Sequence, residues 1–276
     1  MVEDRRSKPR SADERWRTAL TMIEPNKILV RGYPLDEMMG RLTFGDAIYL
    51  LLVGELPSPG MGKMVEAMLV SFIDHGPTPP STLAARNVAT TGATLRGCVA
   101  SGVLGFGRFF GGDIQSTMDM LDGGLDLVRK GQSIKEAAIA IVKQYRDRNE
   151  LPPGFGHRYH TRDPRAARLF QMALELELDG EHVGFIRAIE MALHESDRQM
   201  AQHAPVNIDG AIAAVCGDLG IPADVADGLF MISRIPGIIA HALEEKARYE
   251  PLRRIDPENF VYDGPTQRRL PETRRG

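Results

Sequence analysis

The sequence predicts a mostly α-helical protein, because apolar residues recur at helical spacing over long stretches while alternating strand-like patterns are scarce. The clearest helix covers 133–145, where apolar side chains return every three or four positions and form one face. Ser133 and Glu136 have the spacing of a capping box, which predicts the start of this helix. Short runs at 28–30 and 260–262 are the candidate strands and would add only a small sheet.

The C-terminal half predicts four further helices. An Asp-Pro pair is typical of an N-cap followed by proline at the first helical position, and it predicts a helix over 163–180. Apolar spacing predicts helices over 182–195, 209–220 and 223–247. The last of these contains Pro236, so we expect it to kink or break there.

Composition and charge are those of a soluble globular protein. The chain has 276 residues, of which 43% are hydrophobic and 26% charged, and its formal net charge is −3. This charge gives no reason to propose nucleic acid or an anionic membrane as a partner. The N-terminus carries charge without the apolar core of a secretory signal, and no apolar run is long enough to span a bilayer. We therefore expect a cytoplasmic protein.

Neither a disulfide framework nor a metal site is indicated. Cys98 and Cys216 are too few for a framework, and both lie in apolar, alanine-rich stretches typical of buried positions. No group of histidine, cysteine and acidic residues has zinc spacing, so we expect no catalytic metal. A phosphate-binding P-loop is also absent from the sequence.

The stretch that carries most chemistry is 154–167, which reads GFGHRYHTRDPRAA. Two glycines let the backbone bend tightly ahead of His157, and Arg158 follows directly. Arg165 lies in the first turn of a helix that Asp163 would cap, so an anion there would meet a guanidinium and free helix N–H groups. Spacing alone leaves open a structural turn with surface arginines.

Several motifs together resemble the citrate synthase family, including the citryl-CoA lyase module of ATP-citrate lyase. GFGHR followed by DPRA is similar to the family signature, and further similar segments occur in the same order over about 28–262. These segments are RGYPLDEMMGRLTFGDAIYLLLVGELPS, DHGPTPPSTLAAR, GVLGFGRFFGGD, NIDGA and SRIPGIIAHALEE. The resemblance implies a helical homodimer with a large domain formed by 1–112 and 207–276 and a smaller domain formed by 113–206.

The resemblance also assigns roles to individual residues. His75 and His157 would contact the oxaloacetate-like half of a substrate, and Arg165 and Arg234 would bind its carboxylates. Asp209 would move a proton to or from the carbon beside the thioester. An alternative for Asp209 is a helix N-cap, which would favour a low pKa and leave the task of general base to be supported by other neighbours.

One arginine is expected from the neighbouring subunit. Arg254 corresponds to it, although the adjacent Arg253 competes for that role. Arg158 is the remaining arginine expected at the substrate.

A departure from the family pattern lies in GRFFGGD. Citrate synthases commonly have a histidine immediately before the paired glycines, whereas this chain has Phe110 before Gly111 and Gly112. Phenylalanine cannot donate a hydrogen bond to an enolate oxygen, so that oxygen needs another donor. The lyase module has a similar RFGG stretch, and it is also short, as this chain is.

The implied function is citryl-CoA lyase, which cleaves citryl-CoA or a close 3-hydroxyacyl-CoA to acetyl-CoA and oxaloacetate, with coenzyme A entering and leaving as the thioester. The alternatives are a citrate or 2-methylcitrate synthase, which is an acyltransferase, and a citramalyl- or malyl-type lyase. A non-catalytic CoA- or citrate-binding subunit is less favoured, because pure binding has no need of Asp209. The implied partners are small-molecule acyl-CoA and carboxylate substrates and further copies of the chain, in a homodimer or higher homo-oligomer.

Overall fold

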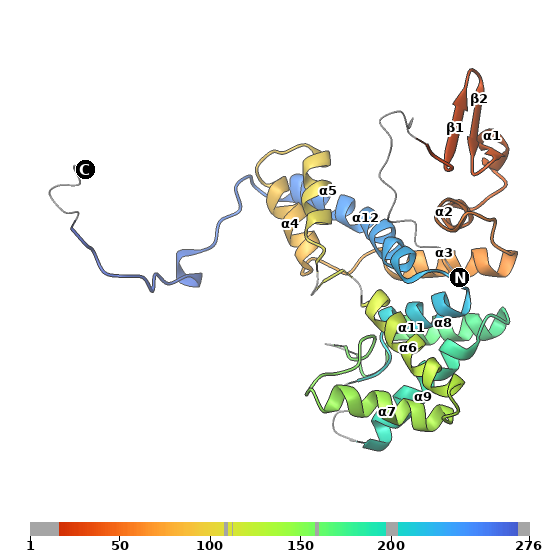
Figure 1. Ribbon diagram of the computed structural model, residues 1–276. Helices are drawn as coiled ribbons and strands as arrows, with labels where there is room; N and C mark the ends of the chain where they lie inside the picture. Colours follow the sequence, from red (N-terminus) through yellow and green to blue (C-terminus); the bar gives the residue numbers. More distant parts are fainter. Residues whose placement is uncertain (1–16, 108–109, 112, 158–159, 197–203, 270–276) are drawn as a thin grey trace, which may run out of the picture. The chain divides into compact units, whose positions relative to one another are not determined.

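The computed structural model describes residues 17–107, 110–111, 113–157, 160–196 and 204–269, and it confirms the predicted helical fold (Figure 1). The described residues form eleven α-helices and one small sheet. The helices are α1 Leu35–Met38, α2 Phe44–Val53, α3 Pro59–Ser71, α4 Pro80–Ala89, α5 Leu95–Leu104, α6 Ile114–Arg129, α7 Ile134–Arg146, α8 Pro164–Glu175, α9 Glu181–Ser196, α11 Ile208–Asp218 and α12 Ala223–Arg248, with a short 3₁₀ turn η1 Pro257–Asn259.

The sheet is a three-stranded antiparallel meander near the N-terminus. Its strands β1 Thr21–Glu24, β2 Lys27–Val30 and β3 Tyr33–Pro34 pair in sequence order. The candidate strand at 28–30 is therefore confirmed. The candidate strand at 260–262 is wrong, because these residues follow η1 as exposed irregular chain.

The chain forms two compact units, and the first comprises residues 1–75 and 107–236. Its centre is α11, in which every residue from Gly210 to Cys216 is buried, so this helix is apolar all round. Helices α6, α8 and α9 pack against it. At Gly124 on α6, a Cβ atom would lie 2.1 Å from the Phe185 ring of α9, so only glycine permits this approach.

The predicted end of one helix differs from the structure, and the predicted start of another agrees with it. The helix begun by Asp163 ends at Glu175 rather than near Gly180, because Glu177 adopts a left-handed φ of 56° and turns the chain away. The predicted capping box of α7 is present, with Ser133 and Glu136 bonded reciprocally.

Helix α12 continues through Pro236, so the helix does not break there, and the alternative expectation of a kink stays a prediction. The boundary between the two compact units nevertheless falls at this proline. By length and composition α12 meets the criterion for a membrane span within the described part of the chain, as core helices of soluble proteins also do.

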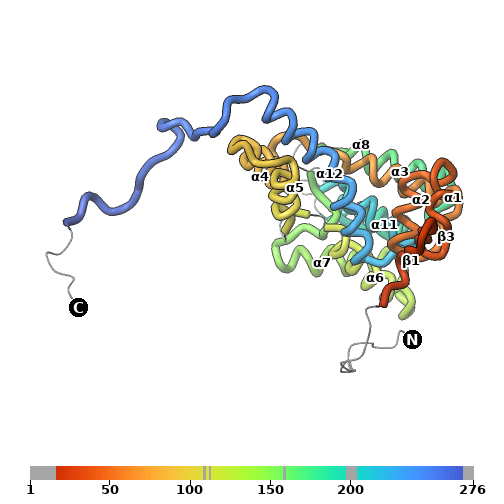
Figure 2. Tube along the Cα trace, turned by 90° about the horizontal axis from the view of Figure 1, so that it is seen from above, coloured from red at the N-terminus to blue at the C-terminus, as the bar shows by residue number. Residues whose placement is uncertain are grey.

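The second unit comprises 76–106 and 237–276. Its core forms where α4 and α5 meet the C-terminal part of α12. The same three helices can be followed in Figure 2. Small residues dominate this core: Ala89, Cys98 and Ala242 are all buried. A Cβ atom at Gly102 would lie 2.7 Å from the Ile238 side chain, so the helices approach closely here.

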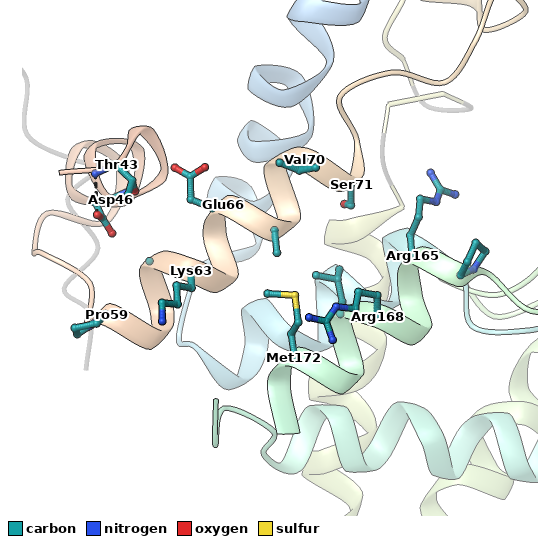
Figure 3. A pocket seen from close by; sticks show the side chains of 14 residues that line it. Thr43, Asp46, Pro59, Lys63, Glu66, Val70, Ser71, Arg165, Arg168 and Met172 are labelled. Carbon is teal, nitrogen blue, oxygen red and sulfur yellow. Dashed lines mark hydrogen bonds between the residues drawn. The ribbon is translucent and has the colours of Figure 1, made fainter. Parts of the chain in front are cut away.

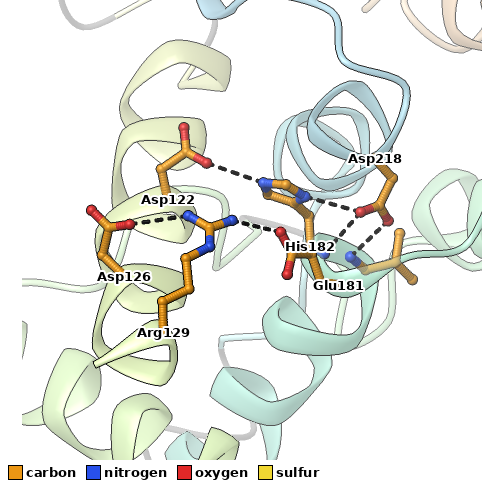
Figure 4. Close-up of polar contacts among 7 residues, drawn as sticks. Asp122, Asp126, Arg129, Glu181, His182 and Asp218 are labelled. Atoms are coloured by element: carbon orange, nitrogen blue, oxygen red, sulfur yellow. Dashed lines mark hydrogen bonds and ion pairs between the residues drawn. The ribbon is translucent and has the colours of Figure 1, made fainter. Parts of the chain in front are cut away.

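A histidine held between two carboxylates ties three helices of the first unit together (Figure 4). His182 on α9 lies 2.9 Å from Asp218 of α11 through Nδ1 and 3.1 Å from Asp122 of α6 through Nε2. Asp218 also accepts hydrogen bonds from the Gly180, His182 and Val183 amides, and so caps the start of α9. Carboxylate acceptors on both ring nitrogens favour the imidazolium form.

The hydrogen bond to Asp218 raises the pKa of His182 against the opposing effect of burial, and Asp122 adds to the rise. A histidine whose pKa is raised by folding stabilises the protein fully below its ordinary pKa of about 6.5. This stabilisation is lost as pH rises through the higher pKa of the folded state.

We therefore expect His182→Gln to destabilise the protein by about 1–3 kcal/mol at pH 6. The difference from the parent protein should shrink as the pH approaches 9, because the parent loses its imidazolium. Urea unfolding of both proteins across this range measures the effect. A difference that does not change with pH would mean that His182 contributes only packing.

Candidate functional site

Two motifs about fifty residues apart in sequence lie side by side in the first unit. An antiparallel bridge pairs Phe155 with Val206, and the Gly156 amide donates to the Pro205 carbonyl at 2.9 Å. The GFGHR loop thereby lies against the segment that leads into NIDGA. These contacts bring the chain around His157 to the N-terminus of α11.

The first turn of α11 rests directly on this loop. The Asn207 amide donates to the Gly154 carbonyl at 3.0 Å, and a Cβ atom at Gly210 would lie 2.3 Å from the same carbonyl oxygen. Gly154 and Gly156 have φ values of 81° and 88°, as the expected tight bend ahead of His157 requires. Glycine is thus needed on both sides of this contact.

Asp163 joins the start of α8 to the start of α11. Its buried carboxylate accepts from the Arg165 amide at 2.9 Å, from Arg165 Nε at 3.0 Å and from Arg165 Nη2 at 2.9 Å. It also accepts from the Ile208 amide at 3.1 Å. Burial acts to raise the pKa of Asp163, but the hydrogen bonds and charge of Arg165 hold it below its usual value.

Asp163 also changes what Arg165 offers to a ligand. The sequence suggested free helix amides beside this arginine, but the Arg165 amide is already bonded to Asp163. Nη1 of Arg165 makes no hydrogen bond to any residue that the structure describes. The guanidinium is therefore fixed in direction and keeps donors for a carboxylate.

Arg234 on α12 is a buried cation with unused donors. Only 3% of the residue is exposed, and its Nε and Nη1 atoms have no hydrogen-bond partner within the described parts of the chain. Its guanidinium lies 5.1 Å from the centre of the Phe230 ring. Burial lowers the pKa of Arg234 to about 10, against the opposing charges of Asp74 and Asp209. Because unpaired buried N–H groups are unfavourable, this geometry fits an anionic ligand.

Asp209 has the properties of a general acid or base near neutral pH. Burial raises its pKa to about 6, with a contribution from Asp113, while Arg165 and Arg234 act in the opposite direction. The alternative role of Asp209 as the helix cap is wrong, because Asn207 caps α11 by accepting from the Gly210 amide at 3.0 Å. The Asp209 carboxylate is therefore not used to cap the helix and is available for proton transfer.

The histidines expected at the site lie near one another. The rings of His75 and His157 are 6.5 Å apart, and His160 stacks on His157 at 4.3 Å. His157 Nδ1 accepts from the His160 amide at 3.2 Å, so a neutral His157 carries its proton on Nε2. Burial lowers the pKa of both His75 and His157, and nearby cationic groups lower it further. Both rings are therefore neutral near pH 7.

Phe110 belongs to an aromatic cluster that contacts Arg234 through the Phe230 ring. Its ring is 6.3 Å from that of Phe230, which in turn packs at 5.0 Å against Phe72. Gly111 follows with a φ of 151°, in the region that favours glycine. Arg158, the remaining expected site residue of this unit, lies outside the described residues.

In the second unit, the structure distinguishes Arg253 from Arg254. Glu245 is 1% exposed and accepts hydrogen bonds from Arg86 at 2.7 Å and from Arg253. Both guanidiniums lie 5.4 Å from the centre of the Tyr249 ring. Arg254 is exposed and makes no ion pair with any other described residue. Arg253 is thus engaged within its own unit, which favours Arg254 for a role elsewhere.

Sequence reasoning missed two acids that influence the site. Asp113 contributes to the raised pKa of Asp209, and Asp74 opposes the lowered pKa of Arg234. Both are adjacent to residues that were selected: Asp113 ends GRFFGGD, and Asp74 precedes His75. Within the described residues, no cluster of three or more histidine, cysteine or acidic side chains is placed to hold a metal ion.

Comparisons with known proteins identify close similarity to one family. The family model described as citrate synthase, C-terminal domain, matches residues 57–255. The structure of citryl-CoA lyase from Hydrogenobacter thermophilus is 40% identical and has a TM-score of 0.83, over 93% of this chain and 97% of that one. The structure of ATP citrate lyase from Methanothrix soehngenii, in complex with citrate and coenzyme A, is 21% identical with a TM-score of 0.77, over 95% of this chain and 43% of that one. This second likeness shows a shared fold.

The curated relatives include citrate synthases. The citrate synthase of Haloferax volcanii is 34% identical over 216 residues, which are 75% of this chain and 52% of that protein. The chain thus spans about half the length of the curated relatives it matches.

The pKa values of Asp209 and Asp163 predict opposite effects of two similar substitutions. The pKa of Asp209 in the folded protein, about 6, exceeds its ordinary value of 3.8, so its ionisation opposes folding increasingly as pH rises between these values. We expect Asp209→Asn to stabilise the protein by about 1–3 kcal/mol at pH 7.5 and to have little effect at pH 4.

Asp163→Asn is the matched control. Its parent carboxylate has a lowered pKa and holds several N–H groups, so this variant should lose about 2 kcal/mol or more at pH 7.5. Chemical denaturation at the two pH values measures both variants. Equal destabilisation by the two substitutions would contradict the opposite pKa shifts of Asp209 and Asp163.

Proposed function

We propose, from the premise that this chain belongs to the citrate synthase family, that it is a citryl-CoA lyase. The family includes enzymes named citryl-CoA lyase and citrate synthase, and the resemblance inferred from the motifs is confirmed. The observation that carries the proposal is the buried Arg234, whose unused donors fit a substrate carboxylate in the same unit as Asp209. The choice of lyase is supported by the similarity to citryl-CoA lyase over nearly the whole of both chains.

The proposed substrate is citryl-CoA, held through its carboxylates. Arg165, oriented by Asp163, and Arg234, backed by Phe230, each present a guanidinium with available donors. Charge-assisted hydrogen bonds of this kind are among the strongest in proteins. Coenzyme A enters as the thioester, which agrees with its presence beside citrate in the structure of the Methanothrix ATP citrate lyase.

Bond cleavage begins at the tertiary hydroxyl. His157 presents its Nε2–H to the hydroxyl oxygen, and neutral His75 takes the hydroxyl proton. The carbon–carbon bond then breaks, the oxygen becomes the ketone of oxaloacetate, and the electron pair passes into the thioester enolate. The lowered pKa of each histidine keeps both rings neutral for these roles.

Asp209 completes the reaction by giving its proton to the enolate carbon, which forms acetyl-CoA. A carboxyl with a pKa of about 6 remains partly protonated near neutral pH, whereas an ordinary aspartate does not. After cleavage, His75 releases the proton it took to solvent, and Asp209 takes a proton from solvent. Both groups thereby return to their starting states. With Phe110 in place of a polar side chain, the enolate oxygen takes its hydrogen bond from backbone N–H or water.

The same proposal covers the catalytic assembly. It comprises a cytoplasmic homodimer in which 113–206 forms the smaller domain and 1–112 with 207–276 the larger one. Arg254 of each subunit enters the site of the other, and Arg158 contributes near the substrate. The exposed Arg254, beside an Arg253 that is engaged by Glu245, supports this assignment.

A citrate synthase is the second candidate, because the chain is 34% identical to the citrate synthase of Haloferax volcanii. A synthase would release free CoA from acetyl-CoA and oxaloacetate, whereas a lyase would release oxaloacetate from citryl-CoA. Citramalyl- and malyl-type thioesters test the remaining lyase alternatives with the same purified protein. Binding of citryl-CoA without turnover would indicate a non-catalytic subunit.

Purified protein should form oxaloacetate from citryl-CoA, measured by coupling to malate dehydrogenase. We expect Asp209→Asn and His157→Ala each to reduce turnover by at least about a hundredfold. The rate of the parent protein should fall as pH rises above about 6, since Asp209 must then be protonated against its pKa. Glu195→Gln, an exposed substitution on α9, is the control and should leave turnover unchanged. Full activity of either site variant would exclude its assigned role.

The sharing of Arg254 between subunits predicts complementation of two inactive variants. A mixed dimer of Arg254→Ala and Asp209→Asn chains contains one site with its own Asp209 and the partner's intact arginine. Random assembly should restore about a quarter of the parent activity. If Arg254 acts in its own chain, no mixed site is complete and activity stays absent. Arg253→Ala should instead lower thermal stability, because it leaves Glu245 buried with one cation fewer.

A further inference from the structure

One side-chain amide joins the GFGHR loop to the helix that carries Asp209. Asn207 Oδ1 accepts from the Gly210 amide at 3.0 Å and caps α11, while Asn207 Nδ2 donates to the Gly156 carbonyl at 3.1 Å. A backbone N–H can bond only to the oxygen of a side-chain amide, and a carbonyl only to its nitrogen. The two partners therefore fix the orientation of this amide, and both of its ends are in use.

The bond to Gly156 acts on the peptide unit that precedes His157. The Gly156 carbonyl belongs to that unit, and the Gly156 amide, on the other side of the same residue, donates to the Pro205 carbonyl at 2.9 Å. Both peptide units of Gly156 are thus bonded to the segment that leads into α11. Because a peptide unit is rigid and planar, these bonds fix the backbone from which the His157 side chain leaves.

The loop needs such bonds because its own sequence is permissive. Gly154 and Gly156 have φ values of 81° and 88°, and glycine moves between backbone conformations more readily than any other residue. The bridge between Phe155 and Val206 holds one part of the loop through the main chain. Asn207 adds a bond from a side chain at the residue next to His157.

The same side chain sets the position of Asp209. Asn207 caps α11 and so determines where the helix begins, and Asp209 stands in its first turn. The main-chain amide of Asn207 also donates to the Gly154 carbonyl at 3.0 Å, so the first turn cannot shift without breaking bonds to the loop. In the proposed reaction, His157 and Asp209 act on the two fragments that bond cleavage produces. Their relative position therefore affects the rate.

The carboxylate-binding arginines are held by other contacts. Arg165 stands in the first turn of α8, beside a groove between α3 and α8 (Figure 3), and its guanidinium is bonded to Asp163. Arg234 lies on α12 with its guanidinium against the Phe230 ring. Loss of the Asn207 amide should therefore affect turnover more than substrate binding.

We propose that Asn207 is a positioning residue, whose single amide group holds the His157 loop and the first turn of α11 in the relation that bond cleavage requires. Its nitrogen fixes the peptide before His157, and its oxygen fixes the turn that carries Asp209. The inference rests on the proposed function for its kinetic test alone. It goes beyond that function by assigning a role to a residue that acts through two others.

Two substitutions separate the helix cap from the bond to the loop. Serine and aspartate cap helices about as well as asparagine, but neither carries an amide N–H group. We expect Asn207→Ser to lower kcat for citryl-CoA cleavage at least about tenfold and to change KM less than about threefold. Asn207→Asp, which keeps the shape of the side chain, should lower kcat as much.

Asn207→Ala loses the cap as well as the bond to the loop. Its kcat should be as low as that of Asn207→Ser, while its Tm should lie about 2–4 °C lower. A parent-like kcat in the serine and aspartate variants, with a loss only in Asn207→Ala, would overturn the proposal, because the residue would then act only as a helix cap.

Ser133→Ala is the matched control. Ser133 caps α7 in the same unit, so this variant loses a helix cap without losing a contact to the loop. It should lower Tm and leave kcat unchanged. A fall in kcat equal to that of Asn207→Ser would show that any lost cap in this unit slows the reaction, and would also overturn the proposal.

A spectroscopic test needs no substrate. The chain has seven histidines, so labelling their Cε1 atoms with ¹³C gives few signals, and the His157 signal is the one that His157→Gln removes. We expect this signal to move in Asn207→Ser and Asn207→Asp and to stay in place in Ser133→Ala. An unmoved signal in both Asn207 variants would overturn the proposal even if turnover falls. If the parent protein does not cleave citryl-CoA but the signal moves as expected, the proposed function fails and the positioning role stands.

Discussion

The candidate site depends on one buried carboxylate. Asp163 caps α8, holds the guanidinium of Arg165 through two nitrogens and accepts the amide of Ile208 at the start of α11. It therefore sets the direction of a cation and the position of the helix that carries Asp209. A carboxylate bonded in this way has little freedom to move, so the two functional groups keep a fixed relation to each other. Removing Asp163 would therefore disturb the proposed carboxylate-binding group, Arg165, and the proposed proton-transfer group, Asp209, together.

The acidity of Asp209 follows from a balance of opposing effects. Burial and the nearby Asp113 favour the neutral acid, while Arg165 and Arg234 favour the carboxylate. Burial and Asp113 alone would leave the pKa higher, the two arginines alone would leave it lower, and together they leave it at about 6. The same burial leaves donors of Arg234 without partners. The unpaired donors of Arg234 therefore lower the stability of the unliganded protein, and a bound anion would remove this cost. Functional sites in proteins often carry such a local loss of stability.

Sequence patterns predicted correctly those features that depend only on residues close together in the chain. The capping box of Ser133 and Glu136 and the glycine bend before His157 needed only neighbouring residues. Tertiary contacts decided the rest. Asn207, rather than Asp209, caps α11 because the helix begins at Ile208, two residues before a helix capped by Asp209 would begin, and α12 continues through Pro236 despite the loss of one backbone hydrogen bond. The choice between Arg253 and Arg254 needed Glu245, eight positions or more away.

In the proposed lyase reaction, Phe110 bears on two parts of the site. Its ring packs edge-on against Phe230, and Phe230 in turn faces the Arg234 guanidinium. An aromatic side chain here extends the apolar surroundings that keep Arg234 out of water, which strengthens its attraction for a carboxylate. It also removes a hydrogen-bond donor at the position where citrate synthases commonly carry histidine. In the proposed mechanism, an enolate oxygen without a histidine donor depends more on prompt protonation of the enolate carbon, and Asp209, with a pKa of about 6, would supply that proton.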